Sequence, residues 1–121
     1  MDYTTIELLD KHNKYREENG KSPLLIDDSL VGACTKHCFW MNKVNVLSHR
    51  GQFGRSHAQR ARIEGYTGLY IAENIALNPN GVDKVFEMWI KSPGHLENIL
   101  GSFTHFGAAK NGDYWCVLFG S

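Results

Sequence analysis

Apolar residues recur at a helical spacing through much of the chain. Residues 4–18 are predicted to form the first helix, with a core-facing stripe that begins at Ile6 and Leu9. The stripe continues through Asn13 and Arg16, and polar side chains on the core side of a helix imply buried hydrogen bonds. After a short apolar anchor at residues 24–26, further helices are predicted at residues 27–44, 56–64, 82–91 and 93–100.

Alternation of apolar and polar positions predicts three strands, at residues 70–77, 103–109 and 114–119. The Asn111-Gly112 pair favours a tight turn that joins the last two strands as a hairpin. Across that turn, one face carries Phe106, Ala108, Trp115 and Val117, and the other carries His105, Cys116 and Leu118. Because both faces are largely apolar, the predicted fold is α+β, a three-layer α/β/α sandwich around a small, mainly antiparallel sheet.

Length and charge restrict the kind of protein that this chain can be. Its 121 residues suit one domain, residues 1–121, and 13 basic residues balance 13 acidic ones. This balance predicts no binding to nucleic acid, and the four arginines from Arg50 to Arg62 are interpreted as a solvated face and loop. No apolar run is long enough for a transmembrane segment, and the first residues do not have the pattern of a signal peptide. The chain therefore acts where it is made, or a leader has been removed.

The three cysteines are an odd number, so they cannot all pair within the chain. Cys34 and Cys38 lie one helical turn apart with parallel side chains, which is a poor geometry for a disulfide. Cys116 could bridge to either of them or to neither. With His37 between them, the helical pair could also form a metal patch, but a structural zinc site needs four ligands. Buried free thiols are the favoured interpretation.

Glu73 is the most unusual residue of the first predicted strand. It shares a face with Ile71, Ile75 and Leu77. A carboxylate among aliphatic side chains must be paired, bound to a metal or protonated, because an isolated buried charge is too costly. A structural hydrogen bond to a backbone amide is an equally weighted alternative.

The segment Ser92-Pro93-Gly94-His95 has the pattern of a helix start. Ser92 suits the N-cap, Pro93 the first helical position, and His95 then falls at the third. The positive end of the helix dipole disfavours an imidazolium there, and a neutral imidazole can bind a metal or accept a proton. The alternative is that His95 only packs in a tight turn between two helices.

Several of these segments together resemble one family. They are His12-Asn13-x-x-Arg16, Leu47-Ser48-His49, Ala72-Glu73-Asn74-Ile75, Trp89-x-x-Ser92-Pro93-Gly94-His95-x-x-Asn98-Ile99-Leu100 and Phe103-Thr104-His105-Phe106-Gly107. In this order and spacing they resemble the CAP superfamily (SCP or PR-1-like domains), in its bacterial-type branch. The similarity extends from about Ile6 to Gly120.

The resemblance implies a polar cleft in the α/β/α sandwich. In eukaryotic relatives, two histidines and two glutamates line this cleft and can hold a divalent metal, often zinc. Carried over, the cleft consists of His49, Glu73, Ser92 and His95, with Ser92 standing where the second glutamate would be. His49 and His95, with Glu73 as a third ligand, could still bind Zn²⁺ with a water in an open position. Glu73 and His95 are the candidate catalytic residues.

Three functions are compatible with these residues. The favoured one is a secreted or surface-exposed binding module for a small lipid-like or peptide ligand, acting as a monomer or as part of a larger protein. The first alternative is a zinc-dependent hydrolase, in which His49 and His95 hold the metal and Glu73 binds it or serves as general base. The second alternative is a cytoplasmic, non-enzymatic, thiol-rich domain. The chain contains no complete catalytic set, which favours binding over catalysis.

Overall fold

The computed structural model describes residues 3–121, which form five α-helices, one short 3₁₀ helix and four strands. In chain order these are α1 (Tyr3–Glu18), β1 (Leu25–Ile26), α2 (Asp28–Val44), η1 (Gln52–Gly54), α3 (His57–Ile63), β2 (Ile71–Leu77), α4 (Val82–Ile90), α5 (Pro93–Ile99), β3 (His105–Asn111) and β4 (Tyr114–Gly120). None of the described helices is both long enough and apolar enough to cross a bilayer.

The strands form one sheet in the order β1-β3-β4-β2. β3 and β4 are the predicted antiparallel hairpin, and β2 pairs antiparallel with β4, so that β2 is an edge strand. The segment predicted as an apolar anchor is instead a fourth strand, since Leu25 pairs in parallel with His105 and its amide donates to the Thr104 carbonyl at 2.9 Å. A strand of two residues is too short to show an alternating pattern, which is why the sequence did not reveal it.

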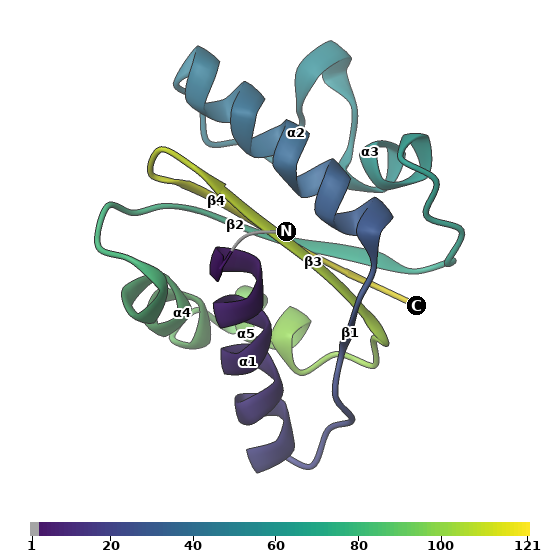
Figure 1. Ribbon diagram of the computed structural model, residues 1–121, viewed down its shortest axis with the longest axis vertical. Coiled ribbons are helices and arrows are strands. Elements are labelled where there is room, and N and C mark those ends of the chain that lie inside the picture. Colours follow the sequence, from purple (N-terminus) through teal and green to yellow (C-terminus); the bar gives the residue numbers. More distant parts are fainter. Residues whose placement is uncertain (1–2) are drawn as a thin grey trace.

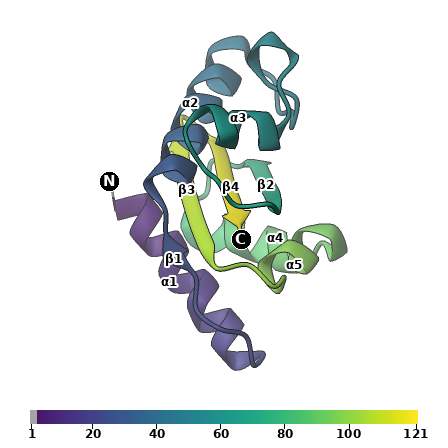
Figure 2. The ribbon, with the colours of Figure 1, turned by 90° about the vertical axis from the view of Figure 1, so that its right-hand side faces the viewer.

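Helices cover both faces of the sheet, which confirms the three-layer α/β/α arrangement. Figures 1 and 2 show α2 and α3 on one face and α1, α4 and α5 on the other. The two faces of the hairpin divide as predicted. Phe106, Ala108, Trp115 and Val117 belong to the core beneath α1, α4 and α5, and Cys116 and Leu118 belong to the core beneath α2.

The buried stripe of α1 differs from the predicted one. Thr5, Leu8, His12 and Arg16 are buried, whereas Ile6 is 44% exposed. A stripe that mixes polar and apolar residues has an ambiguous register, and packing against β3 and α4 decides it. The expectation of buried hydrogen bonding was correct for Arg16, which donates to the buried carbonyl of Ile99, while half-buried Asn13 bonds to both the amide and the carbonyl of Leu24.

All three cysteines are free thiols and fully buried between α2 and the sheet. Cys34 and Cys38 donate to the carbonyls of Gly107 and Ala109 at 3.5 and 3.4 Å. Gly107 has no side chain at the point where the backbone of α2 lies directly on β3, and a Cβ there would overlap Leu30. The favoured interpretation of the cysteines as buried thiols therefore agrees with the structure.

Arg16 joins the end of α1 to the segment between α5 and β3. Its guanidinium donates to the carbonyls of Ile99 and Gly101 at 2.8 and 2.7 Å, and its Nε donates to Ser22 O at 2.9 Å. Arg16→Ala leaves these acceptors without a partner, so we expect the free energy of unfolding to fall by about 3 kcal/mol. Urea denaturation measures this loss.

The matched control for Arg16→Ala is Lys14→Ala, which removes an exposed cation from the same helix. We expect this control to change stability by less than about 0.5 kcal/mol. Equal losses in the two variants would show that the carbonyl contacts of Arg16 are not responsible.

Candidate functional site

Glu73 lies in the middle of edge strand β2 and points toward the layer formed by α2 and α3. Its side chain is only 1% exposed. Oε1 lies 2.9 Å from Nδ1 of His49 and accepts from Nη2 of Arg60 at 3.0 Å. Oε2 lies 2.8 Å from Nη1 of Arg60. Of the alternatives for this carboxylate, the structure therefore selects the ion pair.

Arg60 was wrongly assigned to a solvated face. It comes from α3, its side chain is 9% exposed, and Nη2 also donates to the backbone carbonyl of His49 at 2.7 Å. The guanidinium thus holds both the Glu73 carboxylate and the loop that carries His49. The sequence contained one signal for this contact, the predicted buried carboxylate, which required a cation from elsewhere in the chain.

Opposite charges in this cluster stabilise the ionised forms of Glu73 and His49. Burial opposes ionisation of Glu73, but the hydrogen bonds from His49 and Arg60 outweigh it and lower the pKa of Glu73 to about 2. The hydrogen bond to Glu73 raises the pKa of His49 above its usual value, although partial burial opposes this. The cluster therefore favours an ionised carboxylate flanked by a guanidinium and an imidazolium.

His95 occupies the third position of α5, as predicted, but Ser92 does not cap the helix with its side chain. The Ser92 hydroxyl instead lies 2.8 Å from Nδ1 of His95. The hydroxyl of Ser92 therefore pairs with the imidazole of His95 and not with a backbone amide of the first helical turn. Partial burial and the nearby charge of His49 lower the pKa of His95. The neutral form is favoured as expected, although burial and His49 are the causes.

The edge of β2 separates His95 from Glu73. Asn74, which points to the opposite face from Glu73, donates to the backbone carbonyl of His95 at 3.1 Å. Asn98 of α5 donates to Asn74 Oδ1 at 2.9 Å and to the backbone carbonyl of Glu73 at 3.3 Å. Among residues 3–121, no hydrogen bond joins His95 to His49 or Glu73, so these histidines influence each other through charge.

The expected ligand-cleft residues therefore form two pairs, His49 with Glu73 and Ser92 with His95. The first pair includes Glu73 of β2 itself, and Arg60 contacts both of its members. The second pair is joined to β2 by the hydrogen bond from Asn74 to the His95 carbonyl. The structure brings the two histidines within electrostatic range of each other. It does not join the four residues in one hydrogen-bonded cluster.

The donor atoms around Glu73 do not fit a resident metal ion. Both carboxylate oxygens face Arg60, and one ring nitrogen of His49 is bound to Glu73. Within the described part of the chain, no group of three or more histidine, cysteine, aspartate or glutamate side chains could hold a metal ion. Two imidazoles remain as ligands, fewer than a zinc site requires.

A cluster of thiols lies beneath the carboxylate. Sγ of Cys116 is 3.3 Å from Sγ of Cys34 and 3.4 Å from Oε2 of Glu73. The predicted patch of Cys34, Cys38 and His37 is not a metal site in this arrangement, because His37 Nε2 bonds to Ser48 O at 2.7 Å and the thiols face the sheet. The thiols fill the core under Glu73.

Replacing Glu73 with glutamine removes its ion pairs with little change in size. The contribution of Glu73 to stability is present above pH 4.5 and is lost as the pH falls toward about 2. The contribution of His49 is present below pH 6.5 and is lost as the pH rises through its raised pKa. We expect Glu73→Gln to lower the free energy of unfolding by about 3 kcal/mol. The difference from wild type should be largest between pH 4.5 and 6.5.

Urea unfolding at a series of pH values measures this profile. Glu87→Gln, which changes an exposed carboxylate of α4, is the control and should behave as wild type. A destabilisation of Glu73→Gln that does not vary with pH would show that packing, and not the ion cluster, determines the contribution of Glu73.

Three bacterial structures have the same fold. An extracellular protein with an SCP domain from Bacillus anthracis matches with a TM-score of 0.92 and 21% identity, over 97% of this chain and 40% of the other. An outer surface protein from Borrelia burgdorferi matches with a TM-score of 0.86 and 21% identity, over 95% and 90% of the two chains. A cysteine-rich secretory protein from Staphylococcus aureus matches with a TM-score of 0.80 and 20% identity, over 96% and 37%.

The chain thus spans less than half the length of the Bacillus and Staphylococcus proteins. Comparison with curated proteins gives no match. The CAP family, described as the cysteine-rich secretory protein family, matches over residues 9–119. This match covers nearly all of the chain and agrees with the fold, so the chain belongs to the CAP family.

Proposed function

We propose that this chain is an extracellular binding module, whose cleft of His49, Ser92 and His95 holds a small lipid-like or peptide ligand. The observation that carries the proposal is the state of Glu73, which is fully engaged by Arg60 and His49. The remaining polar groups of the cleft suit binding. The extracellular location is supported by the printed descriptions of the structural relatives, which are extracellular, outer surface and secretory proteins.

The alternative of a hydrolase is less well supported, because Glu73 is a poor general base. A base is most effective when its pKa lies near the working pH, whereas the pKa of Glu73 is lowered to about 2. Removing Arg60 from the carboxylate would leave a buried charge without its main partner, which is costly. The residues therefore favour recognition over proton transfer.

The two imidazoles offer different hydrogen-bonding groups to a ligand. His49 is favoured as an imidazolium and His95 as a neutral ring, so the first can donate from Nε2 and the second has one ring nitrogen beyond the Ser92 contact. Val46 and Leu47, which are exposed, precede His49 and add apolar surface beside it. A ligand with a polar head and an apolar body would complement both.

A titration with two probes, a long-chain fatty acid and a short apolar peptide, tests the binding proposal. We expect one of them to shift the imidazole NMR signals of His49 and His95 saturably, because their ring nitrogens contact the polar head. The double variant His49→Ala, His95→Ala should bind at least about tenfold more weakly, because it loses the charge-assisted hydrogen bonds to the polar head. The control is His105→Ala, since His105 bonds to the Tyr66 hydroxyl.

Unchanged affinity in the double variant would contradict the cleft assignment.

The hydrolase alternative has a separate test in the same preparation. The wild-type protein and Glu73→Gln are compared for turnover of an ester probe. Turnover that is lost in Glu73→Gln while the fold remains intact would favour catalysis over binding.

Zinc is the probe for the metal proposal. Because Glu73 is held by Arg60, we expect Zn²⁺ to bind weakly, and any binding to depend on both His49 and His95. Calorimetry on wild type and on the double variant His49→Ala, His95→Ala measures the stoichiometry. Zinc binding of unchanged stoichiometry in the double variant would show that other residues hold the ion.

A further inference from the structure

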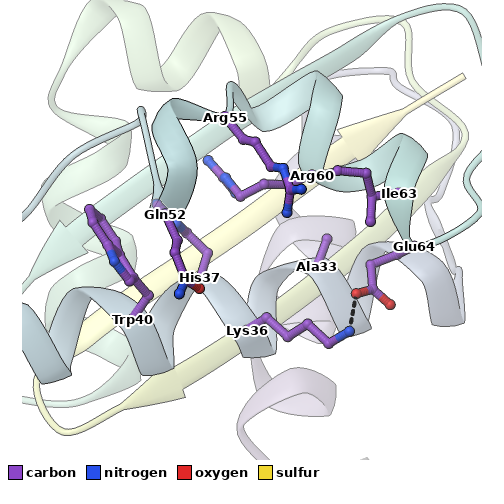
Figure 3. Close-up of a pocket in the computed structure, with 9 residues that line it drawn as sticks. All are labelled: Ala33, Lys36, His37, Trp40, Gln52, Arg55, Arg60, Ile63 and Glu64. Carbon is purple, nitrogen blue, oxygen red and sulfur yellow. Dashed lines mark ion pairs between the residues drawn. The ribbon is translucent and has the colours of Figure 1, made fainter.

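A concave site lies between α2 and the segment formed by η1 and α3. It has a volume of about 120 Å³. Figure 3 shows Ala33, Lys36, His37 and Trp40 of α2 on one side and residues of η1 and α3 on the other. None of the four expected ligand-cleft residues, His49, Glu73, Ser92 and His95, lines it. The ligand for this pocket must therefore be inferred from its own residues.

The pocket carries one uncompensated positive charge. Two of its three strong bases are neutralised, because Lys36 pairs with Glu64 and Arg60 pairs with Glu73. Arg55 is exposed, and within residues 3–121 no carboxylate forms an ion pair with it. Its guanidinium carbon lies 5.1 Å from the centre of the Phe53 ring. The charge balance favours a ligand with a single negative charge.

A second lining residue also has an unmet donor. Nε of Arg60 is buried and has no hydrogen-bond acceptor among the described residues. The guanidinium of Arg60 is therefore only partly used by Glu73 and the His49 carbonyl. Because this nitrogen is buried, we expect a ligand in the pocket to contact the exposed guanidinium of Arg55 instead.

The rest of the lining is apolar and partly flat. Ala33 and Ile63 contribute aliphatic surface, and the Trp40 ring is stacked on His37 with an interplanar angle of 15° and centroids 5.8 Å apart. The volume of about 120 Å³ is close to the size of cavity, about 150 Å³, that accepts one benzene ring. The body of the ligand should therefore be small and planar or aliphatic.

We propose that this pocket binds a small monocarboxylate, with its carboxylate on Arg55 and its body against Trp40 and Ile63. A guanidinium presents two parallel N–H groups that match the two oxygens of a carboxylate. A phosphate dianion would require a second unpaired cation, which the lining does not supply. The site is distinct from the cleft and does not depend on the function proposed for it.

Benzoate is the probe for this proposal, and benzyl alcohol is the neutral probe of similar shape. We expect benzoate to shift the indole N–H signal of Trp40 saturably in NMR titrations of the full chain. Trp89 and Trp115 are each 1% exposed and serve as internal references that should not shift. Benzyl alcohol should bind at least about tenfold more weakly, because it cannot form the charge-assisted pair.

Arg55→Gln tests the assigned cation, and Lys43→Gln is the matched control on α2 outside the pocket lining. We expect Arg55→Gln to weaken benzoate about tenfold and Lys43→Gln to leave it unchanged. Both positions are exposed, so the fold should persist, which circular dichroism checks. Equal affinity of wild type for the two probes, unchanged affinity in Arg55→Gln, or no shift at Trp40 would each overturn the proposal.

Discussion

The buried carboxylate of Glu73 organises the part of the molecule that carries the candidate site. It belongs to edge strand β2, and its partners come from α3 and from the loop before η1. These segments contribute little to the apolar core, since Ala61 is the α3 residue in it. A charged cluster in a region of low dielectric is strong when every member is satisfied and costly when one is removed. The position of His49 thus depends on Arg60 and Glu73.

The loop between α2 and α3 packs closely against this cluster at Gly51. Gly51 is buried against it, and a Cβ at this position would lie 2.9 Å from His37 Nδ1 and 3.2 Å from Arg60 Nε. Any other residue would push these side chains apart. Phe53, two residues later, has a φ of 60°, a conformation that is uncommon for a bulky side chain. The close approach of Gly51 to His37 and Arg60 therefore favours a residue without a side chain at this point of the loop.

The same interaction limits what the proposed cleft could do. Arg60 pairs with the ionised carboxylate of Glu73, which is therefore not free to bind a metal or accept a proton. His49 and His95 remain as the partly exposed polar groups. Their environments push their pKa values in opposite directions, upward for His49 beside Glu73 and downward for partly buried His95. His49, as a hydrogen-bond donor, and His95, as an acceptor, thus lie on either side of β2 within electrostatic range of each other.

The sequence by itself determined the elements whose signals are local. Caps, turns and periodicity depend on residues within a few positions of one another, which explains why α2, α3, α5, β2 and the two faces of the hairpin were predicted closely. The same local reasoning identified Glu73 as a carboxylate in need of a partner and placed His95 at the third position of α5.

Only the tertiary structure decided which residues meet. Arg60 and Glu73 are separated by 13 positions and His49 and Glu73 by 24, and no pattern within either segment specifies the pairing. The two-residue strand β1, the register of α1 and the contact between Ser92 and His95 were likewise unpredictable, because each follows from packing between segments or from a choice among nearby partners. Periodicity shows which face of an element is buried, whereas the partner of a buried charge is selected by the assembled layers.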